Sequence, residues 1–150
     1  MIFIGAAALT MPAIGQHTMS MHFGQPYIVN RGTCRNTILD NVNSIVFIWD
    51  NQTRLTYMNP FGLKYFGFTR DELIGKSIVG TFVPKTSTSG KDLEHMIKDI
   101  VAHPENYVSN QNQNVKKNGE RVEILWSNTA IKDKNGNVLE IISVGNVMKG

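Results

Sequence analysis

The sequence predicts one α+β domain in which short helices and one longer helix cover one face of a five-stranded antiparallel sheet. Five segments between residues 44 and 147 have the β-branched, aromatic or alternating patterns typical of strands. Two Asn-Gly turns, at residues 118–119 and 135–136, join the last three segments as hairpins. One segment, residues 93–101, repeats its apolar residues with the period of a helix.

Composition places the chain among ordinary soluble globular proteins. It has 150 residues, of which 41% are hydrophobic and 18% charged. The formal charge is only +3, and no run of basic residues is longer than two. Nucleic-acid binding favours a clustered basic patch, so we do not expect a nucleic-acid partner. The single cysteine, Cys34, excludes an internal disulfide and a cysteine-rich metal site, which fits a reducing compartment.

Residues 1–36 differ from the rest of the chain. Their first apolar run is shorter than the roughly 20 residues of a membrane-spanning helix and lacks the basic start of a secretory signal. It is compatible with the tail of a membrane helix, a misassigned gene start or a poorly ordered arm. We therefore expect residues 1–36 to be a leader, linker or arm outside the core. The domain then spans residues 37–147, with a tail at 148–150.

The first half of the domain contains two strands and several short helices. Residues 37–41 are a helical turn candidate, and Ser44–Asp50 reads as a strand buried on both faces. A turn leads to a second strand at Leu55–Asn59. Pro60 begins a short helix that ends at Gly67, and Thr69 with Glu72 forms a capping box for the next one. Residues 77–83 are a further short apolar turn.

The second half contains the long helix and three strands. Leu93, Met96, Ile97, Ile100 and Val101 form one apolar stripe on the helix. Pro104 ends this helix at or before His103. Strands are expected at residues 108–116, 121–132 and 138–147, antiparallel to one another.

Four motifs in this order resemble the signature of a PAS domain. Residues 57–76, YMNPFGLKYFGFTRDELIGK, contain an Asn after the second strand, a small helix ending in Gly-aromatic, and a Glu-Leu-hydrophobic-Gly-Lys run. The later matches are KKNGER at residues 116–121 and KDKNGN at 132–137, which precedes VLEII. The resemblance covers roughly residues 37–147.

This resemblance implies a sensor module rather than an enzyme. PAS domains bind small molecules or cofactors between sheet and helices, form dimers with other PAS domains, and pass changes to an output domain. The amide-rich run before KKNGERV and the Trp-Ser-Asn after it are similar to PAS repeats of bacterial membrane-linked sensor kinases. The resemblance therefore implies two-component or related signal transduction. The parent protein would be a histidine kinase or diguanylate cyclase, with the domain in the cytoplasm, either free or in a membrane-associated sensor.

One departure concerns the end of the domain. In the family the last strand usually runs into Asp-Ile-Thr, which connects to a signalling helix. Here the corresponding residues are Val147, Met148 and Lys149, and the sequence ends at Gly150. We therefore expect the output domain to lie outside this chain. The resemblance also implies homodimerisation through PAS–PAS contacts.

Cofactor binding stays open, with no cofactor the favoured interpretation. A haem ligand would come from the long helix, but His95 points away from its apolar stripe and His103 lies where the helix ends. A redox flavin is compatible with hydrogen bonding by Asn112, Trp126 and Asn128. Cys34 precedes the domain, which excludes a light-dependent thiol adduct. Neither a phosphate loop nor a nucleophile elbow occurs, so we expect no catalysis.

The most unusual feature is a strand made of amides, SNQNQN at residues 109–114. Alternation puts Asn110, Asn112 and Asn114 on one face, and it puts Trp126 and Asn128 on the apolar face of the next strand. Buried amides need partners, so they either satisfy one another or bind a polar ligand. The ligand hypothesis names seven residues as the site: Asn128, Trp126, Asn112, Asn110, Trp49, Tyr57 and Met96. The alternative is a structural interaction module without a ligand.

Overall fold

The computed structural model describes residues 17–22, 25–30 and 37–149. The chain divides into two compact units, Met1–Ile38 and Leu39–Gly150. In the first unit, β1 (His17–His22) and β2 (Gln25–Asn30) pair as an antiparallel hairpin, in register from His17 opposite Asn30 to His22 opposite Gln25. This hairpin was not expected, because Gly, Pro and Asn interrupt any apolar period there.

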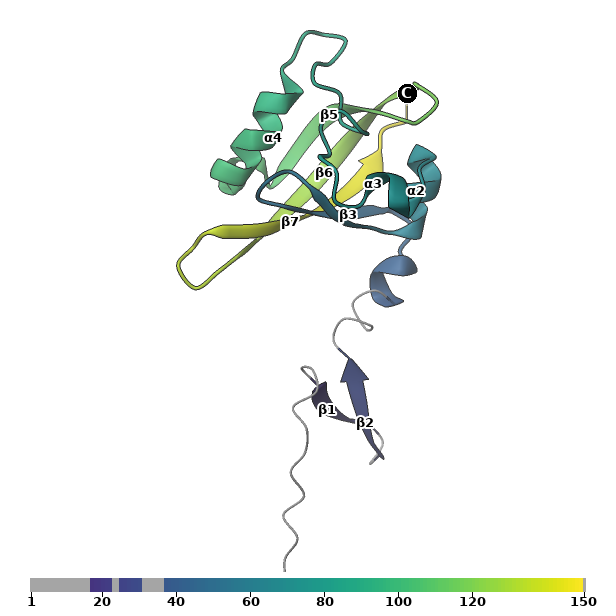
Figure 1. Cartoon of the computed structure of the whole chain (residues 1–150), viewed down its shortest axis with the longest axis vertical. Coiled ribbons are helices and arrows are strands. Elements are labelled where there is room, and N and C mark those ends of the chain that lie inside the picture. The colour runs from purple at the N-terminus through teal and green to yellow at the C-terminus, as the bar shows by residue number, and fades with distance from the viewer. Residues whose placement is uncertain (1–16, 23–24, 31–36, 150) are drawn as a thin grey trace, which may run out of the picture. The chain divides into compact units, whose positions relative to one another are not determined.

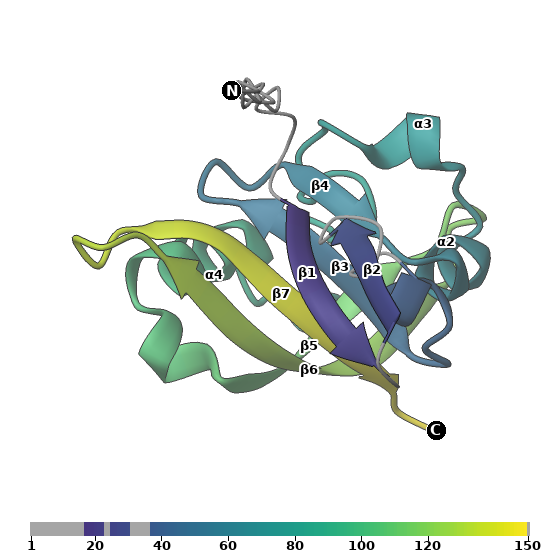
Figure 2. The same ribbon diagram turned by 90° about the horizontal axis from the view of Figure 1, so that it is seen from below.

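The second unit contains the five-stranded antiparallel sheet that the sequence predicts. Its strands are β3 (Ile45–Asp50), β4 (Leu55–Met58), β5 (Ser109–Val115), β6 (Arg121–Lys132) and β7 (Val138–Val147). Their order is β4-β3-β7-β6-β5, and every neighbouring pair is antiparallel. The last strand, β7, therefore lies in the middle of the sheet, between the β3–β4 hairpin and the amide-rich β5–β6 hairpin (Figures 1 and 2).

The predicted helices form where the capping residues place them. Pro60 opens α2 (Pro60–Phe66), which ends at Gly67 with φ 80°. The capping box of Thr69 opens α3 (Arg70–Leu73), and Asp92 caps α4 (Leu93–Ala102) by accepting from the His95 N–H. A 3₁₀ turn, Pro104–Tyr107, follows α4, and residues 37–40 form one further helical turn. Among the described residues no helix is long and apolar enough to cross a membrane.

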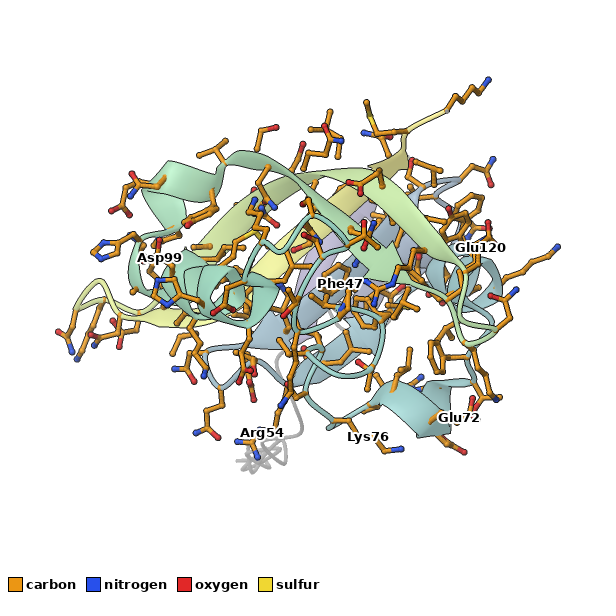
Figure 3. All side chains as sticks on the ribbon, turned by 90° about the horizontal axis from the view of Figure 1, so that it is seen from above. Phe47, Arg54, Glu72, Lys76, Asp99 and Glu120 are labelled. Atoms are coloured by element: carbon orange, nitrogen blue, oxygen red, sulfur yellow. The ribbon has the colours of Figure 1, made fainter. Side chains whose placement is uncertain are left out.

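The hydrophobic core lies between one face of the sheet and the helices. Phe47 is at its centre (Figure 3). Its ring meets Phe82 and Trp126 edge-on, with centroid distances of 5.1 and 5.0 Å. As predicted, β3 is buried on both faces, since Ile45, Val46, Phe47, Ile48 and Trp49 are at most 4% exposed.

Asn59 joins the β3–β4 hairpin to α2 through its side chain. Its Oδ1 accepts from the N–H groups of Val46 and Gly62, at 3.1 and 3.0 Å. Its Nδ2 donates to the carbonyls of Leu39, Val42 and Ser44 at 2.9–3.3 Å. The residue is fully buried, so this Asn replaces a backbone ladder at the point where the chain leaves β4.

We expect Asn59→Ala to lower the free energy of unfolding by about 2–4 kcal/mol, because at least two buried backbone donors lose their acceptor. Denaturant unfolding measures the change. Asn51→Ala is the matched control: Asn51 is exposed and donates one bond to the Val138 carbonyl, so its loss should cost about 1 kcal/mol or less. Equal losses for the two variants would contradict the role of Asn59.

A surface ion pair ties α3 to the turn between β5 and β6. Lys117 Nζ lies 2.6 Å from Glu72 Oε1, and Glu72 also accepts from the Thr69 N–H (Figure 3 labels Glu72). The hydrogen bond from Lys117, followed by that from Thr69, lowers the pKa of Glu72 from 4.5 to about 2.

This pKa shift predicts a pH dependence of stability. The contribution of Glu72 is fully present above about pH 4.5 and is lost as the pH falls toward 2, because the folded state resists protonation. Glu72→Gln should therefore lose less stability than the wild type between these pH values, as measured by thermal unfolding. Asp71→Asn removes an adjacent carboxylate with no ion pair among the described residues, and it should retain the wild-type profile. Identical profiles for wild type and Glu72→Gln would contradict the prediction.

Candidate functional site

The core contains a small cavity between α4 and strands β3, β5, β6 and β7. Its volume is about 10 Å³, room for about one water molecule. Its wall is mixed: apolar rings and aliphatic side chains on one part, and five polar side chains on the other. These five are Asn110, Asn112, Asn114, Asn128 and Ser143. We refer to the four asparagines as the amide cluster.

Strand alternation delivers the amide cluster to the interior. On β5, Asn112 and Asn114 are 5% and 0% exposed and Asn110 is half-buried, whereas Ser109 and Gln111 are exposed. On β6, Trp126 and Asn128 face inward with Ile124. The burial confirms that the apolar face of β6 predicted from alternation is the one that faces the core.

A chain of hydrogen bonds begins at Trp49 on β3. The Trp49 Nε1–H donates to Ser143 Oγ at 3.0 Å, and the Ser143 hydroxyl donates to Asn128 Oδ1 at 2.7 Å. Asn128 Nδ2 then donates to Asn110 Oδ1 at 2.6 Å and to the Tyr107 carbonyl at 2.7 Å. These bonds connect four strands, β3, β7, β6 and β5, through side chains, and they reach the 3₁₀ turn through the Tyr107 carbonyl.

The chain continues along β5 to the segment before α4. Asn110 Nδ2 donates to Asn112 Oδ1 at 3.0 Å, and Asn112 Nδ2 donates to Asn114 Oδ1 at 3.2 Å. Asn114 Nδ2 donates to the Phe82 carbonyl, while its Oδ1 also accepts from Trp126 Nε1–H at 3.1 Å. Within residues 37–149 no buried side-chain nitrogen or oxygen lacks a partner. The amides therefore satisfy one another in this state.

Two neighbours hold the ends of this arrangement in place. A Cβ on Gly145 would lie 2.3 Å from Trp126 Cζ3, so the absence of a side chain at this point of β7 lets the indole ring lie on the strand. Tyr107, whose carbonyl accepts from Asn128, donates its hydroxyl to Asp99 Oδ2 at 2.7 Å. That hydrogen bond raises the pKa of the Tyr107 phenol, because its anion would face a carboxylate.

The structure brings most of the predicted site residues together. Trp49, Asn110, Asn112, Trp126 and Asn128 line the cavity. Met96 is buried on α4, and its Sδ lies 3.9 Å from Asn110 Nδ2.

Tyr57 is the exception, and the prediction that it lines the pocket wall is wrong. It pairs with Ile48, whose side chain points to the sheet face opposite Phe47 and Trp49. Its hydroxyl donates to Asp40 Oδ1 at 2.6 Å, away from the cavity.

Two polar residues of the site were missed. Asn114 shares the inward alternation of Asn110 and Asn112, so the strand pattern was sufficient to include it. Ser143 gives no such indication, because it lies in the mostly apolar β7 and acquires its role only from Trp49 and Asn128.

Haem does not fit the described residues. Both candidate ligands on and after α4 face away from the cavity: His95 is exposed, and His103 is exposed with Nδ1 3.6 Å from Glu105 Oε1. A flavin ring is far larger than the cavity, and the amides that would bind its edge are already bonded to one another. Within the described ranges no group of three or more His, Cys, Asp or Glu side chains is arranged to bind a metal ion.

Comparison with known proteins agrees with this architecture. The sequence matches the family model described as the PAS fold over residues 35–148. No curated protein sequence matches it significantly.

Solved structures similar to this chain include several PAS domains. One from Colwellia psychrerythraea is 18% identical with a TM-score of 0.64, and the match covers 77% of this chain and 95% of that one. A PAS domain from a two-component sensor histidine kinase is 9% identical with a TM-score of 0.59, covering 78% and 96%. An RNA-binding light-oxygen-voltage receptor is 12% identical with a TM-score of 0.63, covering 78% and 33%.

At such low sequence identity, these solved structures show only that the fold is shared. The family match spans most of the chain and agrees with the strand order and the residue motifs. The chain belongs to the PAS fold family and carries a PAS sensor domain.

Proposed function

We propose that this domain is the sensory module of a bacterial signal-transduction protein, of the histidine kinase or diguanylate cyclase type, and that it detects a small molecule at the amide cluster. One observation carries the proposal. Four asparagines and a serine meet at a cavity whose other lining residues are aromatic or aliphatic. Convergent polar groups in an apolar setting are the usual composition of a small-molecule site.

The location of the amide cluster supports a route for the response. Ser143 lies on the central strand β7, hydrogen-bonded to Trp49 on one side and to Asn128 on the other. A ligand that replaced the hydrogen bonds of Asn128 would change the acceptor of the Ser143 hydroxyl. It would thereby affect the hydrogen bond between Ser143 on β7 and Trp49 on β3. A ligand shifts the population of the domain only if it binds the two arrangements with different affinity, and the exchange of these bonds supplies such a difference.

A second candidate is a relay module without a ligand. It is favoured by the cavity of about 10 Å³ and by the complete bonding of the buried polar side chains in residues 37–149. In that case the amide cluster is a structural network that fixes how β5 and β6 pack against α4.

In either case we propose that the domain acts as a homodimer in the cytoplasm, free or attached to a membrane-associated sensor. The output would be an attached domain outside this chain. We propose no catalytic role for the chain itself.

A metabolite screen of the whole chain tests the proposal. Thermal unfolding and native mass spectrometry should identify a metabolite that raises Tm and adds its mass. Asn128→Leu should abolish that rise, whereas Gln111→Leu, on the outward face of β5, should retain it. A wild-type protein that binds nothing in the screen would contradict ligand sensing and favour the relay. Visible absorbance would instead indicate a haem or flavin.

Stability measurements on the same variants test the structural role of the cluster. Asn128→Leu should lower the free energy of unfolding by about 1–3 kcal/mol, because the Tyr107 carbonyl and the Asn110 Oδ1 lose their donor. Gln111→Leu should change it by less than about 0.5 kcal/mol, as for most surface substitutions. A stable Asn128→Leu variant would show that the hydrogen-bonded chain is not needed for folding.

A further inference from the structure

The hydrogen-bonded chain through the amide cluster has one direction. Every amide donates toward the Phe82 end and accepts from the Trp49 end. This direction is fixed by groups that can only donate or only accept a hydrogen bond. The indoles of Trp49 and Trp126 only donate, and the carbonyls of Tyr107 and Phe82 only accept. Reversing any one amide would set donor against donor or acceptor against acceptor.

Asn110 is the member of the cluster with the weakest bonding at an accessible position. Asn128 and Asn112 each use their Nδ2 for two oxygen acceptors. Asn110 Nδ2 has one oxygen acceptor, Asn112 Oδ1, and a thioether contact at 3.9 Å to Met96 Sδ. Sulfur is a weak acceptor. Asn114 also has one oxygen acceptor, but it is fully buried, whereas Asn110 is half-buried.

Met96 is the side chain best suited to yield to a ligand. It is unbranched and flexible, and it occupies the space next to the second N–H of Asn110. The α4 side chains that line the cavity itself, Ile97 and Ile100, are β-branched and stiffer than Met96. Displacement of Met96 would enlarge the cavity beside the amide that has most to gain from a new acceptor.

The charge of the wall restricts the class of ligand. None of the residues that line the cavity is charged. A buried anion or cation would have no counter-ion there, and an unpaired buried charge is strongly unfavourable. The direction of the chain restricts it further: a carboxylate cannot donate onward, and an ammonium group cannot accept.

Resting on the proposed ligand-sensing function, we propose that Asn110 and Met96 form the recognition point for a neutral ligand that carries an acceptor oxygen beside a donor, such as a carboxamide or lactam. The ligand displaces Met96, accepts from Asn110 Nδ2 and donates to Asn112 Oδ1. The direction of the chain is then preserved from Trp49 to Phe82.

Three probes of nearly equal shape test this inference: benzamide, benzoate and benzamidinium. The protein is the whole isotope-labelled chain with Met96→Ala, which opens space beside Asn110. NMR titration follows the Asn side-chain amide signals. Benzamide should bind at least about tenfold more tightly than either ion, since tenfold corresponds to only about 1.4 kcal/mol and an unpaired buried charge costs more. It should also shift the Asn110 and Asn112 signals.

Two further variants make the result specific. Asn110→Ala in the Met96→Ala background should lose benzamide binding, whereas Gln111→Ala in that background should retain it. Met96→Val removes less volume and replaces Met96→Ala if the latter does not give the spectrum of a folded protein.

Three outcomes would overturn the inference: no benzamide binding to the folded variant, benzoate or benzamidinium binding as tightly as benzamide, or binding that survives the loss of Asn110. The proposed sensory function fails on a different measurement, when no metabolite binds the wild type. If the Met96→Ala variant prefers benzamide to both ions but the wild type binds no metabolite, the inference about the ligand class holds and the proposed sensory function fails.

Discussion

The constraint on which this domain depends is that every polar group in its core must find a partner of the right polarity. Five polar side chains lie between the sheet and α4, and they are satisfied as one directional chain from the Trp49 indole to the Phe82 carbonyl. That chain crosses from β3 to β7, β6 and β5 and then runs along β5. It therefore ties strands together on the helix side of the sheet, where hydrophobic packing alone would leave their relative positions less specific.

Asn59 solves a similar problem at the other end of the domain. There a single amide bonds five backbone groups from three segments, and it replaces the ladder that ends with β4. Asn59 and the amide cluster differ in how easily their hydrogen bonds can be exchanged. Asn59 is bonded almost entirely to backbone, which is fixed by secondary structure. The amide cluster is bonded largely side chain to side chain, so its bonds can be exchanged without unfolding a strand.

This difference suits a sensor. Under the proposed function, the response would start at side-chain bonds that a neutral molecule can replace and would reach β7, the strand that pairs with both β3 and β6. β7 carries Ser143, whose hydroxyl donates to Asn128, so a change in the bonds of Asn128 would reach the last strand of the sheet directly. The relay interpretation uses the same geometry with the amide cluster as a fixed network.

The sequence alone determined the local structure. Alternation placed the three asparagines of β5 on one common face and Trp126 and Asn128 on the apolar face of β6, and Pro60 and the capping box of Thr69 indicated where two of the helices begin. These features depend on residues close together in the chain, and the motifs around them were sufficient to indicate the family. The hairpin at residues 17–30 was missed because its short strands lack a clear period.

Only the tertiary structure decided which distant groups meet. The pairing of β3 with β7 brings Ser143 between Trp49 and Asn128, and no local pattern in β7 predicts it. Tyr57 falls on the outer face because it pairs with Ile48, whose side chain points away from the core, and a register shift at the next residue brings Leu55 opposite Trp49. The volume of the cavity and the direction of its hydrogen bonds likewise follow from packing across five segments, because each amide takes its orientation from partners far away in sequence.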